Sequence, residues 1–332
     1  MDAVLFVGHG SKDPAGNEEV RQFVAGIANE LAVPLVETCF LEFVQPDMYR
    51  GLDTCVQKGA TRIVVIPIML FSAGHAKIHI PAAIDEVREK YPLVEFIYGR
   101  PVGIHEEVLS ILEARLEEVG VPAGSKPEEM AVLIVGRGSS DPDANSDLYK
   151  MARLFTERTG VKIVETGFMG VTFPLFDEGM ERCLKLGARH VVVLPYFLFT
   201  GVLMKRMAEY LEEWTKREPD KQFTLAEYFG FHPLLKEVFK DRVEEAFQGR
   251  VRMNCDTCQY RLAAMEHIGH HHHHHHDHDH HHEHDHHHEH GHSHDHQHHH
   301  GHDHHHEHDH HHHDDDDHEH DHHHHPITLI RK

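Results

Sequence analysis

Three side chains that could bind a metal ion or accept protons occur in the first third of the chain. His9, Glu42 and His75 each follow a run of apolar and β-branched residues. Such runs are typical of buried parallel strands, whose carboxyl ends meet at one edge of a sheet, so we expect the three side chains to share a cleft. Two imidazoles and a carboxylate suit a divalent ion such as cobalt, iron, nickel or zinc, and they can also accept protons near neutral pH.

The surrounding residues predict alternating strands and helices. The predicted strands are Ala3–Val7, Pro34–Phe40, Arg62–Met69 and Val94–Tyr98. The predicted helices are Pro14–Leu31, Pro46–Lys58, a segment ending near Lys90, and Ile104–Val119. Four strand–helix units in succession indicate a parallel sheet with helices on both faces.

This pattern begins again 128 residues later. The segment AVLFVGHGS at 3–11 is matched by AVLIVGRGS at 131–139, and VETCF at 36–40 by VETGF at 164–168. Pro67 has its counterpart in Pro195 at the same offset. We therefore expect an α/β protein of two tandem duplicated units, each a four-stranded parallel sheet with helices on both faces, packed around a pseudo-two-fold axis.

The two copies differ at the residues with chemical potential. Arg137, Gly170 and Leu203 stand at the positions that correspond to His9, Glu42 and His75. A structural role would have had the same reason to persist in both halves, so the asymmetry predicts one active site, carried by the N-terminal unit.

The expected boundaries follow from the repeat and from changes in composition. They are an active N-terminal unit at 1–120, a linker at 121–130, a C-terminal unit with a degenerate site at 131–250, an M-x-C-x-x-C segment at 251–268, a His/Asp-rich tail at 269–325 and a C-terminal end at 326–332.

The formal charge of −23 is unevenly distributed. The segment 270–325 holds 37 of the 44 histidines and 15 acidic residues without Lys or Arg, so the rest of the chain carries only −8. Neither part has the basic patch that nucleic acid requires. No apolar run reaches the roughly 20 residues of a membrane span, and the N-terminus lacks a basic signal-peptide region. We therefore expect a cytoplasmic protein.

Three motifs together resemble the class II chelatases of the CbiX/SirB type. They are GHGS followed by Asp13-Pro14, the segment Phe40–Glu42 followed by Pro46, and LFSAGH followed by Ile80-Pro81. The resemblance covers residues 1 to about 250. It implies a lyase that inserts cobalt or iron into sirohydrochlorin during cobalamin or sirohaem synthesis, with release of two pyrrole protons.

The resemblance also implies roles for individual residues. His9 and His75 would hold the ion and take up protons, and Glu42 would orient a histidine or relay protons. Two segments would line the ring: Phe43, Val44 and Gln45, and Leu70, Phe71, Ser72, Ala73 and Gly74. Lys77, Arg100 or Arg137 could pair with substrate carboxylates, although ordinary surface charge is the simpler interpretation of each. His79 is a possible extra metal contact.

Cys255 and Cys258 form a C-x-x-C outside a thioredoxin-like context, which favours a metal or cluster site over a redox pair. The M-x-C-x-x-C pattern resembles the extension of long CbiX proteins, which implies a [4Fe–4S] cluster that two subunits of a homodimer could share. A zinc site or a free dithiol remains an alternative.

The segment His270–His325 has no apolar residues to offset chain entropy, so the sequence predicts a disordered tail. Its imidazoles and carboxylates would bind several divalent ions, as a metal store or delivery arm.

The function expected from these features is insertion of Co²⁺ into sirohydrochlorin in cobalamin biosynthesis. One alternative is the same reaction with iron. Another, of a different class, is a non-enzymatic metal-storage protein or metallochaperone. Neither a nucleic acid nor a membrane is expected as a partner.

Overall fold

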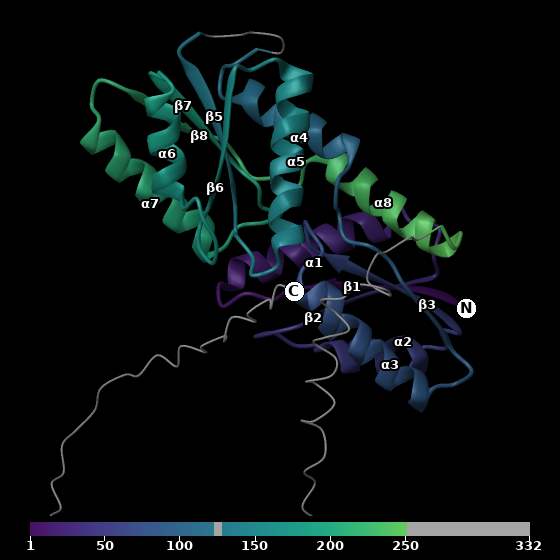
Figure 1. The fold of residues 1–332 in the computed structure, drawn as a ribbon. Coiled ribbons are helices and arrows are strands. Elements are labelled where there is room, and N and C mark those ends of the chain that lie inside the picture. The colour runs from purple at the N-terminus through teal and green to yellow at the C-terminus, as the bar shows by residue number, and fades with distance from the viewer. Residues whose placement is uncertain (123–127, 251–332) are drawn as a thin grey trace, which may run out of the picture. The chain divides into compact units, whose positions relative to one another are not determined.

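The computed structural model describes residues 1–122 and 128–250, and it begins with a four-stranded parallel sheet. Its strands are β1 (Asp2–Gly8), β2 (Leu35–Phe40), β3 (Arg62–Ile68) and β4 (Glu95–Tyr98), in the spatial order β2-β1-β3-β4. The first three are labelled in Figure 1. The residues of β1 from Ala3 to Val7 are fully buried. This burial explains the continuous apolar run, because both faces of a parallel sheet are covered by helices.

The helices of the first unit follow from amphipathic segments with recognisable start signals. They are α1 (Pro14–Ala28), α2 (Met48–Gln57), α3 (Ile80–Lys90) and α4 (Glu106–Glu118), with a short π-helical turn, η1 (His75–His79), directly before α3. Asp13 and Asp47 accept hydrogen bonds from backbone N–H groups in the first turns of α1 and α2, which satisfies donors that a helix start leaves free.

The second half repeats this arrangement. Strands β5 (Met130–Gly136), β6 (Ile163–Phe168), β7 (His190–Pro195) and β8 (Gln222–Leu225) form a parallel sheet in the order β6-β5-β7-β8. Its helices are α5 (Pro142–Thr159), α6 (Phe176–Lys185), α7 (Val202–Arg217) and α8 (Pro233–Phe247). The register repeats as well: Val4 pairs with Val36 and Val64, as Val132 pairs with Val164 and Val192. The predicted duplication of a four-stranded α/β unit is confirmed.

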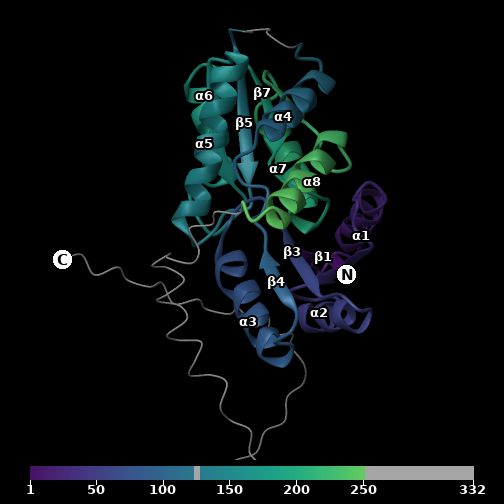
Figure 2. The ribbon, with the colours of Figure 1, turned by 90° about the vertical axis from the view of Figure 1, so that its right-hand side faces the viewer.

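The last helix of each unit packs against the sheet of the other unit. Helix α4 contacts β7 and α5, whereas α8 contacts β3 and β4, and the two helices also contact each other (Figure 2). Arg242 of α8 is buried and donates hydrogen bonds to the carbonyl oxygens of Pro101 and Val102 in the first unit. One apolar core therefore contains residues of both halves, among them Phe6 and Phe239, whose rings lie 6.2 Å apart.

The predicted strands and helices agree with the observed ones to within about three residues. Among the residues described, no helix is both long and apolar enough to cross a bilayer. The predicted C-x-x-C site at Cys255 and Cys258 and the His-rich tail lie outside the described residues.

Candidate active site

The loops after β1 and β2 bring His9 and Glu42 side by side. The backbone N–H of Leu41 donates to the carbonyl oxygen of Gly8, and that of Glu42 donates to the carbonyl oxygen of His9 at 3.1 Å. The pairing of the two strands thus continues one step past their ends. This extra pairing fixes the two side chains at the same edge of the sheet.

Gly10 makes this approach possible. Its φ of +87° lies in the left-handed region, and a Cβ atom on it would lie 1.9 Å from the carbonyl oxygen of Glu42. Only glycine tolerates both conditions. The second unit repeats the arrangement, since a Cβ on Gly138 would lie 1.9 Å from the carbonyl oxygen of Gly170.

The third side chain comes from η1, the π-helical turn that follows β3. Such turns are rare and often occur at functional sites. His75 and His79, four residues apart, contact each other through their Nδ1 atoms at 3.0 Å. Lys77 between them is buried, and its Nζ lies 2.7 Å from Asp141 and 2.9 Å from Asp143 of the second half. The turn is therefore tied to α5 of the other unit.

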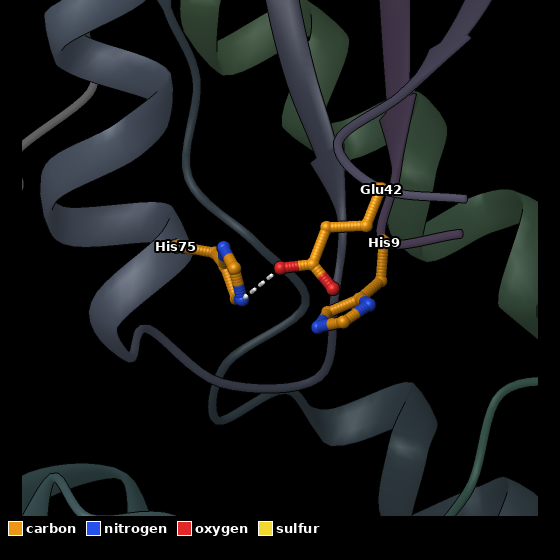
Figure 3. A group of neighbouring side chains, drawn as sticks. All are labelled: His9, Glu42 and His75. Atoms are coloured by element: carbon orange, nitrogen blue, oxygen red, sulfur yellow. Dashed lines mark ion pairs between the residues drawn. The ribbon is translucent and has the colours of Figure 1, made fainter. Parts of the chain in front are cut away.

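The ligand atoms of His9, Glu42 and His75 all lie within 4.8 Å of one another. Nε2 of His75 is 3.4 Å from a carboxylate oxygen of Glu42, and the two imidazole rings are 4.6 Å apart at 80°. Figure 3 shows the three side chains converging on one space. Each is partly exposed, so an ion and a larger ligand can reach them.

The hydrogen bonds of His9 indicate its tautomer. Nδ1 lies 3.1 Å from the carbonyl oxygen of Gly10, and Nε2 lies 3.0 Å from Nη1 of Arg137. A carbonyl oxygen only accepts and a guanidinium only donates, so Nδ1 carries the proton and Nε2 presents a lone pair. That lone pair is the one a metal ion would use.

Both histidines favour the neutral form that metal binding requires. Burial, followed by the positive charge of Arg137, lowers the pKa of His9. Burial, together with the neighbouring His9 and His79, lowers the pKa of His75 to about 4, against the opposing effect of Glu42. Imidazole lone pairs are thus available at neutral pH.

Comparison with known proteins places this arrangement in a family. The CbiX family model matches residues 3–119 and 131–246, that is, both halves. The chain belongs to the CbiX family. A sirohydrochlorin cobaltochelatase from Priestia megaterium is 62% identical over 272 residues, which cover 82% of this chain and 88% of that one. A sirohydrochlorin ferrochelatase from Bacillus subtilis is 37% identical, with 79% and 98% covered.

Solved structures of the family agree with the fold. SirB from Bacillus subtilis with Fe³⁺ has a TM-score of 0.66 at 37% identity and covers 74% of this chain and 95% of its own. SirB from Bacillus subtilis subspecies spizizenii in complex with cobalt has a TM-score of 0.63 at 33% identity, with 74% and 94% covered.

The remaining sites that the sequence suggests for this CbiX chain are placed as follows. Among the proposed ring-lining residues, Phe43 is 61% exposed at a φ of +62°, in a region that non-glycine residues rarely adopt. Val44 and Leu70 instead pack against the core, and Phe71 stacks on Tyr196 at 5.2 Å. Phe43 is thus the large apolar side chain of this set that is open to a ligand. His79 contacts His75 but is not part of the three-residue ligand group.

The three basic residues considered as partners of substrate carboxylates differ in their contacts. Lys77 is buried in its ion pairs with α5, and Arg100 pairs with Glu245. Both have carboxylate partners within the chain, whereas Arg137 contacts His9 of the site. Sequence reasoning could not predict this contact, because its one signal is that Arg137 occupies the repeat position of His9.

Proposed function

We propose that this CbiX-family chain is a sirohydrochlorin cobaltochelatase, which inserts Co²⁺ into sirohydrochlorin during cobalamin synthesis in the cytoplasm. The observation that carries the proposal is the group His9, Glu42 and His75, whose potential ligand atoms lie within 4.8 Å of one another and which has no counterpart in the second unit. The 62% identity to a relative of that name supports cobalt over iron, because the ferrochelatase relative described above is only 37% identical.

In this proposal His9 and His75 present the ion to one face of the macrocycle. Insertion replaces two pyrrole N–H bonds by bonds to the metal, so two protons must leave for each ion that enters. As the ion moves from the imidazoles to the ring nitrogens, the Nε2 lone pairs become free and can accept these protons. Glu42, 3.4 Å from Nε2 of His75, orients that ring and passes protons on.

The ring itself would lie beside the exposed Phe43. An aromatic side chain in a strained backbone conformation offers a flat apolar contact for a macrocycle at low entropic cost. Gln45 and the backbone of Ser72, Ala73 and Gly74 remain proposed lining residues. The carboxylates of sirohydrochlorin would reach basic side chains at the rim.

The test is insertion of Co²⁺ and Fe²⁺ in parallel, under anaerobic conditions, followed by the change in absorption of sirohydrochlorin. We expect cobalt insertion well above the uncatalysed rate, and its loss in His75→Ala. Glu165→Gln serves as a control because Glu165 lies on β6 of the unit without the ligand group. No catalysed insertion with either ion would overturn the proposal, and faster insertion of iron would favour a ferrochelatase.

A metal-storage protein is the second candidate, and the composition of the tail is the observation that favours it. The segment 270–325 holds 37 histidines and 15 acidic residues, enough to bind several ions. Removing residues 269–332 separates the two functions. A chelatase keeps its turnover when metal is in excess, whereas a storage protein loses nearly all bound metal and has no turnover to keep.

The C-x-x-C at Cys255 and Cys258 stays a prediction from the sequence. A [4Fe–4S] cluster shared between two subunits would give iron and sulfide in the anaerobically purified chain, and Cys258→Ser would remove both together with the dimer. Zinc in place of iron would instead indicate a structural site.

A further inference from the structure

Arg137 of the second unit contacts His9 of the first unit, and the two residues occupy the same position of the repeat. Both follow the first strand of their units, in Gly8-His9-Gly10 and Gly136-Arg137-Gly138. The guanidinium Nη1 lies 3.0 Å from Nε2 of His9. The contact thus crosses between the two copies of the repeat and ends on a proposed metal ligand.

The guanidinium and a metal ion would use the same lone pair. Nδ1 of His9 donates to the carbonyl oxygen of Gly10, so Nε2 is the nitrogen left to bind an ion, and it accepts from Arg137. A metal–imidazole bond is about 2.1 Å long, so the ion would lie between Nε2 and the present position of Nη1. The ion can therefore bind His9 only when Arg137 moves away.

The positive charge of Arg137 has an effect even after this movement. A guanidinium cannot lose its proton in a protein, and it remains attached to the loop that follows β5. It therefore repels a divalent cation at the ligand group. Glu42 supplies one negative charge to the site, and Arg137 offsets it.

We propose that Arg137 lowers the affinity of the ligand group for a metal ion. It occupies Nε2 of His9 when no ion is present, and it favours transfer of the bound ion to the macrocycle. A site that delivers its metal must not hold it too strongly, because every increment of ground-state affinity slows the transfer. The inference rests on the proposed chelatase function for its purpose, but not for its effect on affinity.

The experiment measures Co²⁺ affinity of the full chain by competition with a chromogenic cobalt indicator. Each Arg137 variant is compared with the same variant carrying His9→Ala, and the difference isolates the site from ions bound elsewhere. Arg137→Leu removes the donor and the charge, Arg137→Gln keeps a donor without charge, and Arg137→Lys keeps the charge. Arg189→Leu is the matched control, because this exposed arginine precedes β7 at the opposite edge of the sheet.

We expect Arg137→Leu to bind Co²⁺ about tenfold more tightly than the wild type, as loss of a unit charge some 5 Å from the ion predicts. Arg137→Gln should tighten it as well, and Arg137→Lys and Arg189→Leu should not. In the insertion assay, Arg137→Leu should lower both kcat and the KM for cobalt. Impaired folding would weaken binding, so it cannot imitate this result.

Unchanged or weaker cobalt affinity in both Arg137→Leu and Arg137→Gln would overturn the inference. If the KM for sirohydrochlorin rose at the same time, Arg137 would be an anchor for substrate carboxylates. A wild type that inserts no metal would overturn the proposed function alone, because the affinity comparison does not depend on turnover.

Discussion

Nζ of Lys77 lies 2.7 Å from a carboxylate oxygen of Asp141, and the residues at the repeat positions, Lys205 and Asp13, form the corresponding ion pair at 2.6 Å. The two pairs join the units reciprocally, each lysine reaching the helix start of the other half. They differ in environment, since the side chain of Lys77 is 6% exposed and that of Lys205 is 63% exposed. Burial alone would lower the pKa of Lys77, but Asp141 and Asp143 raise it to about 12.

The first prediction compares Asp141→Asn with Asp13→Asn. Both aspartates accept a hydrogen bond at a helix start, and asparagine caps helices equally well, so the substitutions differ mainly in the ion pair they break. Removing the partner of a buried charge costs about 3–5 kcal/mol, and Asp143 beside Lys77 should keep the loss at the lower end. The exposed pair should contribute at most about 1 kcal/mol. Denaturant unfolding of both variants measures the difference.

A control for this comparison is Lys205→Met, which should change the free energy of unfolding as little as Asp13→Asn does. Equal losses in Asp141→Asn and Asp13→Asn would show that burial does not distinguish the two pairs.

The second prediction concerns Glu42→Gln. The amide has the shape of the carboxylate but neither its charge nor its ability to accept a proton near His75, so insertion should slow by at least about 100-fold. The thermal unfolding temperature should stay close to that of the wild type, because Glu42 is partly exposed. Glu37→Gln, which removes the partly exposed carboxylate on β2 that pairs with Lys58, should leave the rate unchanged. A Glu42→Gln rate within a few-fold of wild type would exclude Glu42 from the chemistry.

The convergence of His9, Glu42 and His75 could be predicted from the sequence because parallel strands end at a common edge. His9 and Glu42 lie just after the ends of β1 and β2, and His75 begins the turn that follows β3, so the strand positions placed all three side chains at one edge. The repeat offset was equally informative, since it predicted that the second sheet repeats the first.

Contacts between the two copies could not be predicted in this way. The packing of α4 on β7 and of α8 on β3 depends on how two sheets dock, and no local pattern of hydrophobic residues distinguishes a helix that covers its own sheet from one that covers another. For the same reason Lys77 looked like a surface charge, although it is buried against Asp141. One feature of the repeat could have indicated a structural role for Lys77. Both Lys77 and Asp13 have identical counterparts at the offset of 128.

The third prediction tests the contact between His79 and His75. His79 lies 3.0 Å from Nδ1 of His75 and can fix the orientation of the ring whose Nε2 faces Glu42. Loss of such a supporting contact typically costs 10–100-fold in metal affinity or activity, so His79→Ala should fall about tenfold below the wild type in kcat/KM for cobalt. His79→Asn should recover part of the loss by offering a side-chain partner. His105→Ala, which removes a helix cap far along the chain, is the control. Equal rates for His79→Ala and wild type would contradict the supporting role.

The fourth prediction concerns the pH dependence of stability. His190, at the start of β7, contacts Oγ1 of Thr224 at 2.9 Å, and burial lowers the pKa of His190 from its ordinary value of 6.5. In the unfolded chain this imidazole takes up a proton near pH 6.5, whereas in the folded chain it does so only at lower pH. The unfolded state then binds more protons, so the free energy of unfolding falls as the pH drops below 6.5.

His190→Gln keeps a side chain that can reach Thr224 but does not titrate, so its stability should fall less steeply between pH 7 and pH 5 than that of the wild type. Denaturant midpoints across this range measure the slope. Thr224→Val separates the two effects, because it removes the hydrogen bond but leaves the buried imidazole, and should lower stability with the wild-type slope. Parallel curves for wild type and His190→Gln would mean that burial of His190 makes no contribution to the acid sensitivity of the fold.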